Sequence, residues 1–274
     1  MKKITLWLLA FSGIFLLTEC SRNPISGRKQ FKLIDEGALQ QMALQEYRTF
    51  LSDTKTKVLS ETVNRDAEMV RRVGTRISKA VTDYYTQQGQ GNLLSGYQWE
   101  FNLVESKDVN AWCMPGGKVC VYTGLLPITQ NEAALAVVMG HEIAHALLTH
   151  GNERISQTYA AQGVQIAGNV ALGKNPQAVN IFNALYGVGA QVGVLLPFSR
   201  KQELESDRFG LIFAAMAGYN PQESIPLWQR MAKASGGNKP PEWLSTHPAE
   251  ERRIQKLSES MEEALKYYNP VNSR

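Results

Sequence analysis

"GHEIAHALLTH", residues 140–150, contains three of the four histidines in this chain of 274 residues. The residues around it are rich in Ala and Leu and include no Pro, so they predict a helix over 131–149. Thr129 is the expected N-cap, because Glu132 follows it at the spacing of a capping box. The position of each histidine on this helix decides which of them can act together.

His141 and His145 are four residues apart, so they lie on one helical face, separated by about 40°. His150 lies roughly 180° around the helix from His141 and cannot join the other two from one straight helix. We therefore expect His150 to have a structural role, paired with Glu153 or Arg154.

The His-Glu-x-x-His spacing is the one that zinc chemistry requires. His141 and His145, one turn apart, can bind the ion from one side, and Glu142 reaches the open coordination position, where it can take a proton from bound water. The alternative is a solvated helix that carries these residues by chance. Apolar neighbours favour a buried helix, whose polar groups need partners such as a metal. These neighbours are Val137, Val138, Met139, Ile143, Ala144, Ala146 and Leu147.

A catalytic zinc site usually has three protein ligands and keeps one position for water. The segment "FSRKQELESDRFG", residues 198–210, offers Glu203 as the third ligand. Asp207 lies one turn further on the same helical face, where a carboxylate can fix the orientation of a ligating histidine. Glu205 competes for the ligand role, but it points about 200° away from Glu203 on a helix. Taken alone, the segment is typical of an exposed charged face.

Five motifs, in order, resemble one family of zinc metallopeptidases, which includes the CAAX prenyl proteases, the bacterial heat-shock protease HtpX and periplasmic quality-control proteases such as BepA. The motifs are "NPISGRKQFKLI" (23–34), "NAWCMPGGKVCVYTGLL" (110–126), "HEIAH" (141–145), "SRKQELESD" (199–207) and "STHPAEERRI" (245–254). Together they extend over nearly all of the chain beyond its N-terminal targeting segment.

The resemblance implies an α+β fold, mainly α, of the zincin-like type, with a small sheet or hairpin beside the active-site helix. It implies one zinc ion per chain, bound by His141, His145 and Glu203. It assigns Glu142 as the catalytic base and Asp207 as the support of a ligand. The chain is accordingly expected to be a zinc metalloendopeptidase.

Strand patterns surround a Pro-Gly-Gly turn. Segment 97–104 alternates as a strand, and segments 109–114 and 118–124 flank the turn as a hairpin. In peptidases of the kind that this chain resembles, an edge strand above the active helix pairs with extended substrate backbone. The hairpin is expected to supply that strand, and an ordinary buried hairpin is the alternative. The expected substrate-binding residues are Asn110, Ala111 and Trp112, with Arg253 from the last motif.

Cys113 and Cys120 flank the same turn. Pairing of Met114 with Val119 sets the two cysteines opposite one another, close enough for a disulfide in an oxidising compartment. Two buried free thiols are the alternative.

The N-terminus is typical of a targeting segment. Two lysines precede a largely apolar run over residues 4–17, which predicts a signal peptide over residues 1–19. Cys20 resembles the lipid-modified cysteine of bacterial lipoproteins, although Glu19 stands where a small residue is usual. An uncleaved anchor is the alternative.

The expected organisation is a signal peptide over 1–19, a lipid-anchored segment over 20–34 and a metallopeptidase domain over 35–274. The expected location is the bacterial cell envelope, facing the periplasm, with a lipid holding the protein to a membrane. The expected partners are protein or peptide substrates and that membrane.

Composition supports one globular domain. Hydrophobic residues make up 43% and charged residues 20%, and a net charge of +4 without a concentrated basic patch gives no reason to propose nucleic-acid binding. Periodicity predicts amphipathic helices over 36–52 and 61–85. Between Ser156 and Ser199 the only charge is Lys174, so this run is either a second membrane span or packed helices beside the site. Its polar residues and glycines favour packed helices.

His247 is the one histidine outside the active helix. Pro248 marks the start of a helix over 249–268, which leaves His247 on a loop, and the resemblance puts that loop beside the zinc cleft. Two active roles are open to His247: it can donate a hydrogen bond to the oxyanion, or bind zinc as a fourth ligand that displaces the catalytic water. A capping or surface position is the third interpretation.

The main hypothesis is an endopeptidase that hydrolyses misfolded or misassembled envelope proteins. A second hypothesis is an envelope chaperone or assembly factor with secondary or no proteolysis, and a third is a non-proteolytic zinc hydrolase. The presence of every expected catalytic residue type disfavours an inactive enzyme.

Overall fold

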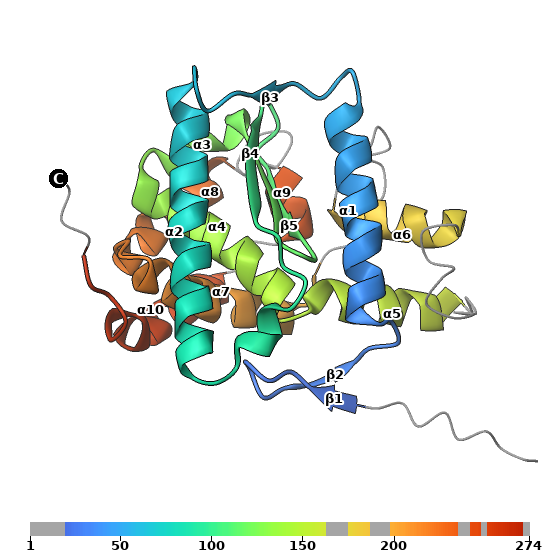
Figure 1. Ribbon diagram of the computed structural model, residues 1–274. Coiled ribbons are helices and arrows are strands. Elements are labelled where there is room, and N and C mark those ends of the chain that lie inside the picture. Colours follow the sequence, from blue (N-terminus) through green and yellow to red (C-terminus); the bar gives the residue numbers. More distant parts are fainter. Residues whose placement is uncertain (1–19, 163–174, 187–197, 235–241, 248–250, 271–274) are drawn as a thin grey trace, which may run out of the picture.

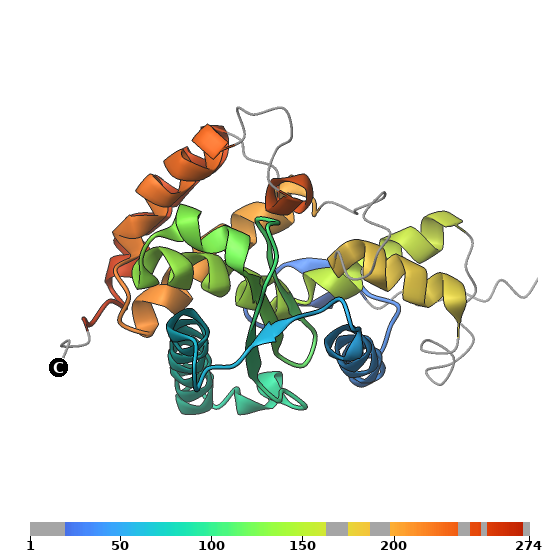
Figure 2. The same cartoon turned by 90° about the horizontal axis from the view of Figure 1, so that it is seen from above.

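The computed structural model describes residues 20–162, 175–186, 198–234, 242–247 and 251–270. Two long helices, α1 (Glu36–Ser52) and α2 (Arg65–Gln87), stand on either side of a small sheet (Figure 1). Seen from above, the remaining helices extend around the far side of that sheet (Figure 2). The predicted α+β, mainly helical, zincin-like fold is confirmed.

The central sheet has four strands in the order β3-β4-β6-β5. β4 and β6 are parallel, whereas β3 with β4 and β5 with β6 are antiparallel. Because β5 comes last in this order, one of its backbone edges has no neighbouring strand among the described residues. The strand bounds are Val58–Leu59 for β3, Glu100–Val104 for β4, Ala111–Met114 for β5 and Lys118–Tyr122 for β6.

The hairpin is present, but its expected register is wrong by one residue. Met114 pairs with Lys118, and Cys113 therefore pairs with Val119 instead of with Cys120. All three residues of the Pro-Gly-Gly segment form the connection, and both of its glycines have φ near +83°, a region that favours glycine.

The register decides the fate of the two cysteines. A shift of one residue turns a side chain to the opposite face of a sheet. Cys113 accordingly lies in the apolar cluster that contains α2 and the active helix, whereas Cys120 lies in the cluster on the other face with α1. Both are free, buried thiols, so the disulfide interpretation is wrong and the free-thiol alternative is confirmed.

The active helix, α4 (Glu132–Leu147), is capped two residues later than expected. Asn131 is the N-cap, and its side chain accepts a hydrogen bond from the third helical N–H. Thr129 instead ends the short helix α3 (Leu126–Thr129). Gln130, with φ of 66°, reverses the chain between the two helices, so the capping-box prediction is wrong here.

α4 crosses α7 (Arg200–Met216) at a contact between two glycines. A Cβ on Gly140 would lie 2.6 Å from the carbonyl oxygen of Gly210, and a Cβ on Gly210 would lie 2.7 Å from the backbone nitrogen of His141. Glycine is thus required by close helix packing. The crossing brings the two motif-bearing helices within reach of one ion.

The other predicted helices are present with small shifts at their ends. Helix 36–52 coincides with α1, and helix 61–85 begins later, because Asn64 caps α2. The last predicted helix, 249–268, corresponds to α10, and residues 248–250 lie outside the described part. Further bounds are α5 (His150–Gln162), α6 (Pro176–Tyr186), α8 (Ser224–Ala234), α9 (Glu242–Thr246) and α10 (Glu251–Leu265).

The apolar run between Ser156 and Ser199 is described only in part, because residues 163–174 and 187–197 lie outside the described chain. Its described parts belong to α5 and α6, which pack in the second apolar cluster. Across the described residues, every helix is too short or too polar to cross a bilayer. The signal peptide over 1–19 also lies outside the described residues.

A two-stranded hairpin, β1 (Cys20–Arg22) with β2 (Lys29–Phe31), precedes α1. It lies beneath the junction of α4 and α5 (Figure 1). Residues beyond it pack on α5, since the backbone nitrogen of Leu33 donates to the hydroxyl of Ser156 over 2.9 Å. The segment expected as an anchor before the domain is therefore in contact with the domain.

Candidate metal centre

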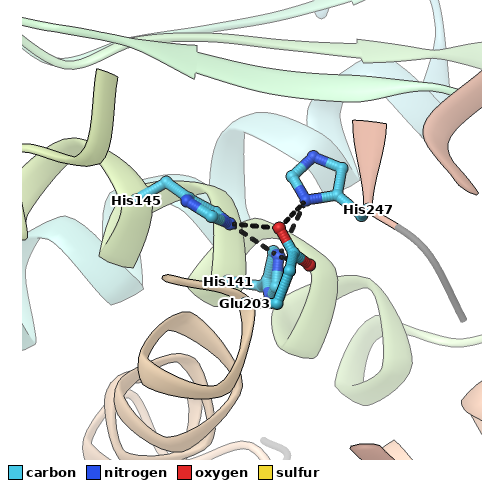
Figure 3. A group of neighbouring side chains, drawn as sticks. All are labelled: His141, His145, Glu203 and His247. Carbon is cyan, nitrogen blue, oxygen red and sulfur yellow. Dashed lines mark hydrogen bonds and ion pairs between the residues drawn. The ribbon is translucent and has the colours of Figure 1, made fainter. Parts of the chain in front are cut away.

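Four buried side chains from three separate parts of the chain converge on one point (Figure 3). α4 supplies His141 and His145, α7 supplies Glu203, and the residue after α9 supplies His247. One ligand-type atom from each lies within 4.8 Å of all the others. The predicted trio thus comes together, and His247 joins it.

The distances between these atoms fit a tetrahedral ion. Zinc bonds of 2.0–2.1 Å to nitrogen and oxygen place tetrahedral ligands about 3.3–3.4 Å from one another. The Nε2 atoms of His141 and His145 are 3.0 Å apart, and His145 Nε2 is 3.3 Å from Glu203 Oε1. His247 Nδ1 is 3.2 Å from His141 Nε2 and 3.0 Å from Glu203 Oε1. Four donors at these separations leave space for an ion at their centre.

A carboxylate sets the tautomer of His141. Its Nδ1 lies 3.0 Å from Oδ1 of Asp207, which only accepts hydrogen bonds when ionised. Nδ1 of His141 therefore carries the proton, and its Nε2 presents a lone pair to the centre. The supporting contact expected of Asp207 is present.

A second histidine sets the tautomer of His145. Its Nδ1 lies 3.0 Å from Nδ1 of His150, whose other nitrogen, Nε2, faces Oε2 of Glu205 over 3.1 Å. Because the carboxylate of Glu205 accepts, Nε2 of His150 carries the ring proton, and burial lowers the pKa of His150 despite that carboxylate. Nδ1 of His150 then accepts from Nδ1 of His145, which leaves a lone pair on His145 Nε2.

The position of His150 confirms that it lies off the metal group, but its expected partners were wrong. The chain turns sharply at Thr149, which has φ of 54°, and His150 begins α5 instead of continuing α4. Its side chain meets Glu205, the residue that the sequence ranked as a competing ligand. Glu205 is absent from the four-residue group, in agreement with its position on the opposite face of α7 from Glu203.

These tautomers indicate a cation. The Nε2 atoms of His141 and His145 both direct lone pairs into the same 3.0 Å gap, where they repel one another in the absence of positive charge. Burial lowers the pKa of His145, which opposes relief of this repulsion by protonation. The residues therefore fit a bound divalent metal.

Arg253 holds the carboxylates from behind. Its Nε donates to Oδ2 of Asp207 and its Nη2 to Oδ1 of Asp207, each over 2.8 Å. Its Nη1 lies 2.8 Å from Oε2 of Glu203. The guanidinium also stacks on Trp228, 4.1 Å from the ring centroid. Arg253 is 3% exposed, and it contacts these carboxylates instead of the lining of the pocket expected for substrate.

This arrangement keeps both carboxylates ionised. Burial opposes the ionisation of Glu203, but the neighbouring His247 and the charge of Arg253 outweigh it and hold the pKa of Glu203 well below its ordinary value. Burial likewise opposes the ionisation of Asp207, and Arg253 again lowers its pKa. A ligand and its support are thus charged across the physiological range.

Glu142 lies beside the four donors, with its carboxylate already engaged. Oε1 of Glu142 accepts a hydrogen bond of 2.7 Å from the indole nitrogen of Trp243. Nε2 of His247 lies 3.6 Å from the same oxygen. The rings of Trp243 and His247 stack with centroids 4.8 Å apart. The segment after α8 therefore covers both the metal group and the expected base.

A small pocket of about 20 Å³ separates β5 from the centre, enough for about one water molecule. Asn110, Ala111 and Trp112 line it, so the expected substrate strand lies alongside the metal group. The ring of Trp112, however, packs edge-on against Tyr47 and Phe50 in the second apolar cluster. At this edge β5 therefore offers its backbone, which gives little side-chain selectivity.

Comparison with known proteins agrees with this geometry. Residues 76–261 match "Peptidase family M48". The chain belongs to peptidase family M48. It is a zinc metalloendopeptidase, as the sequence predicted.

Relatives of this M48 chain include mitochondrial and bacterial proteins. It is 31% identical to "Mitochondrial metalloendopeptidase OMA1" of Schizosaccharomyces pombe, over 94% of this chain and 71% of the relative. It is 27% identical to "Metalloprotease LoiP" of Escherichia coli, over 94% of this chain and 97% of the relative. It is 32% identical to "Beta-barrel assembly-enhancing protease" of Yersinia pestis, over 57% of this chain and 33% of the relative. The BepA-type resemblance is thus supported, and the mitochondrial OMA1 proteins join it.

Sequence reasoning about this M48 chain missed three contacts at the centre. The hydrogen bond from Trp243 to Glu142 had no sequence signal beyond the position of Trp243 near the last motif. Phe198 packs on the ring of His145, with centroids 4.1 Å apart, and lies next to the motif that begins at Ser199. Arg28, in the first motif, bonds to Glu205 over 2.6 Å. That first motif was the signal, but no spacing rule connects it with a histidine so distant in sequence.

Proposed function

We propose that this M48 enzyme binds one zinc ion per chain through His141, His145 and Glu203, and hydrolyses misfolded or misassembled proteins in the bacterial cell envelope. The observation that carries the proposal is the convergence of four buried donors beside Glu142. Two relatives, one named for β-barrel assembly and one a metalloprotease of Escherichia coli, support a bacterial setting.

In the proposed reaction Glu142 is the general base. A zinc ion held by these residues would act as a Lewis acid on the scissile carbonyl and on the attacking water. Glu142 would accept the proton of the attacking water and deliver it to the leaving amine. Asp207 and Arg253 act from behind, since they keep the ring of His141 and the carboxylate of Glu203 in place.

We further propose that His247 is a fourth ligand in the resting enzyme. Its Nδ1 lies at tetrahedral distances from His141 and Glu203, in the position that the catalytic water requires. Its Nε2 faces Glu142 at 3.6 Å, so the same ring also shields the base. Movement of His247 would open the site for water and substrate. The other active role, donation to the oxyanion, requires a different ring position from this one.

Substrate is proposed to bind as an added strand along β5. The edge position of β5 in its sheet and its place along the pocket beside the metal group support this. The backbone nitrogen of Trp243 donates to the carbonyl oxygen of Val109 over 2.9 Å, just before β5, so the α9 segment lies beside the start of this edge. Displacement of that segment would free both the base and the edge together.

The proposed anchor is a lipid on Cys20, which begins β1 after the predicted signal peptide. It would hold the enzyme at a membrane on the periplasmic side. Labelling of the protein in bacteria with an alkyne-bearing fatty acid tests this. Incorporation into the wild type, with none in Cys20→Ser, is expected, and equal labelling of both would refute the assignment.

The function itself is tested by digestion of unfolded casein. We expect cleavage by the wild type, loss of cleavage with a zinc chelator and loss in Glu142→Gln, whose side chain keeps its shape but cannot accept the proton. Cleavage that survives both treatments would contradict the mechanism. In cells, rescue of envelope assembly by Glu142→Gln as well as by the wild type would favour the chaperone hypothesis.

A further inference from the structure

A partly buried charge network joins the N-terminal hairpin to the back of the metal centre. Arg28, in the turn between β1 and β2, contacts two carboxylates from different helices. Its Nε donates to Oε2 of Glu205 over 2.6 Å, and its Nη1 and Nη2 donate to Glu153 over 2.7 and 2.5 Å. The Arg28 side chain is 11% exposed, so water screens these pairs less than it screens surface pairs.

The network continues to a metal ligand. Glu205 accepts from Nε2 of His150, and His150 accepts from Nδ1 of His145, over 3.1 and 3.0 Å. Arg28, Glu205, His150 and His145 thus form one path from the hairpin to the centre, with side contacts from Arg28 to Glu153 and from Ser206 Oγ to His150 Nδ1 over 3.2 Å. Each group in it has a fixed donor or acceptor role, because a guanidinium only donates and an ionised carboxylate only accepts.

The same hairpin fastens the end of the active helix. The side-chain nitrogen of Gln30 donates to the carbonyl oxygen of Leu148 over 2.6 Å, and the hydroxyl of Thr149 donates to its side-chain oxygen over 2.8 Å. Gln30 is buried. The junction at Thr149, which lets His150 turn back onto His145, is therefore held by β2.

We propose that Arg28 is a positioning residue for the metal site, acting through Glu205 and His150 on the ring of His145. This inference rests on the proposed role of His145 as a zinc ligand. Arg28 orients Glu205, Glu205 fixes the proton of His150 on Nε2, and His150 thereby fixes the proton of His145 on Nδ1. The lone pair of His145 Nε2 is then available to the ion without a tautomeric change.

The proposal predicts effects on metal affinity that a merely structural role would not produce. Groups that orient a ligating histidine alter metal affinity by about tenfold to a hundredfold when they are removed. We expect Arg28→Gln to weaken zinc binding of the purified full chain by about tenfold, measured by competition with a chromophoric chelator. Lys29→Gln is the matched control, because it removes the same charge from an exposed neighbour in the same hairpin.

Substitutions at His150 separate positioning from packing. Gln retains an acceptor for His145 and a donor for Glu205, whereas Phe retains the ring volume and removes both hydrogen bonds. We expect His150→Phe to lose about as much zinc affinity as Arg28→Gln and His150→Gln to lose much less. The double variant Arg28→Gln with His150→Phe should lose no more than the worse single variant, because both act along one path.

Three results would overturn the proposal. One is zinc affinity in Arg28→Gln equal to that of Lys29→Gln, another is equal affinity in His150→Phe and His150→Gln, and the third is fully additive losses in the double variant. If Arg28→Gln does not fold, the zinc affinities of Glu205→Ala and Glu205→Gln are compared instead. Of these two variants only Glu205→Gln can accept a hydrogen bond from His150, so equal affinities would refute the path. His145→Ala distinguishes the underlying function, because full zinc retention there would remove His145 itself from the ligand set.

Discussion

The indole nitrogen of Trp243 donates to Oε1 of Glu142 over 2.7 Å, and the indole ring stacks on His247. The side chain of Trp243 therefore hydrogen-bonds to the proposed base and stacks on the proposed fourth ligand. Both contacts come from the short segment that precedes α10, so displacement of this segment would release the two catalytic positions in one movement.

Removal of the indole donor should raise basal activity. Trp243→Phe keeps a stacking ring but loses the hydrogen bond to Glu142, which exists only in the covered state. A hydrogen bond to a charged group contributes about 1.5–3 kcal/mol, so the expected rise in the initial rate of casein cleavage is about tenfold to a hundredfold. Zinc content should not change. A fall in rate would indicate that Trp243 assists the base instead.

His247→Ala should raise basal cleavage as well, because the water position at the proposed zinc is then free. The initial rate on unfolded casein and the affinity for zinc are the two measurements. Ser245→Ala is the control, since Ser245 is exposed in the same segment and lies outside the metal group. A lower turnover rate with unchanged zinc affinity would identify His247 as the oxyanion donor.

A metal assay should distinguish the roles of a proposed ligand, a residue that supports a ligand and the proposed base. His145→Ala should lose most of the zinc, and Asp207→Ala should bind it about tenfold to a hundredfold more weakly, as losses of ligand support do. Glu142→Gln should keep one zinc per chain and lose turnover. Elemental analysis of the purified variants gives the answer, and full zinc in His145→Ala would remove that ligand from the site.

The glycine contact between α4 and α7 should be sensitive to one methyl group. In Gly210→Ala the new Cβ would lie 2.7 Å from the backbone nitrogen of His141, so the helices must move apart. We expect a loss of about 1–3 kcal/mol in the free energy of unfolding, as overpacking gives, together with weaker zinc binding. Urea unfolding of the metal-free protein and chelator competition measure the two effects. Unchanged values for both would show that the crossing is not tight in solution.

Stability should depend on pH through the hairpin network. Burial raises and Arg28 lowers the pKa of Glu153, and for Glu205 burial is opposed chiefly by His150 and then by Arg28; both carboxyls end below their ordinary value. A carboxyl with a lowered folded pKa contributes stability above the unfolded pKa, about 4.3 for Glu, and that stability is lost as pH falls through the folded value.

Arg28→Gln should accordingly destabilise the protein most at neutral pH, by about 1–2 kcal/mol, and progressively less below about pH 4. Urea unfolding of the metal-free wild type and variant at several pH values tests this. Lys29→Gln should show no such trend. A difference between wild type and Arg28→Gln that stays constant from pH 7 to pH 3 would contradict the assignment of these pairs.

Local sequence determined the heart of the site. His141, Glu142 and His145 lie within one helical turn and a half, so helix geometry alone fixes their common face. The same rule separated Glu203 from Glu205 on α7, and the structure keeps them apart. Short-range periodicity also located α1, α2 and α4 to within a few residues of their ends.

Predictions that depended on a turn were less secure. The Pro-Gly-Gly segment allows two loop lengths, and a difference of one residue moves Cys120 to the opposite face of the sheet from Cys113. The left-handed conformation of Gln130 likewise moved the helix cap from Thr129 to Asn131. Each depends on one backbone conformation that the local residue pattern does not single out.

Only the tertiary structure decided which distant groups meet. Arg28 lies far from Glu205 in sequence, and so does Trp243 from Glu142, yet both pairs are in hydrogen-bond contact. No periodicity links such residues, because their separation in space is set by the helix crossing at Gly210 and by the reversal at Thr149. The sequence alone thus determined the chemistry of the centre, through residue types at helical spacing, and the packing of helices and hairpin determined what holds and covers it.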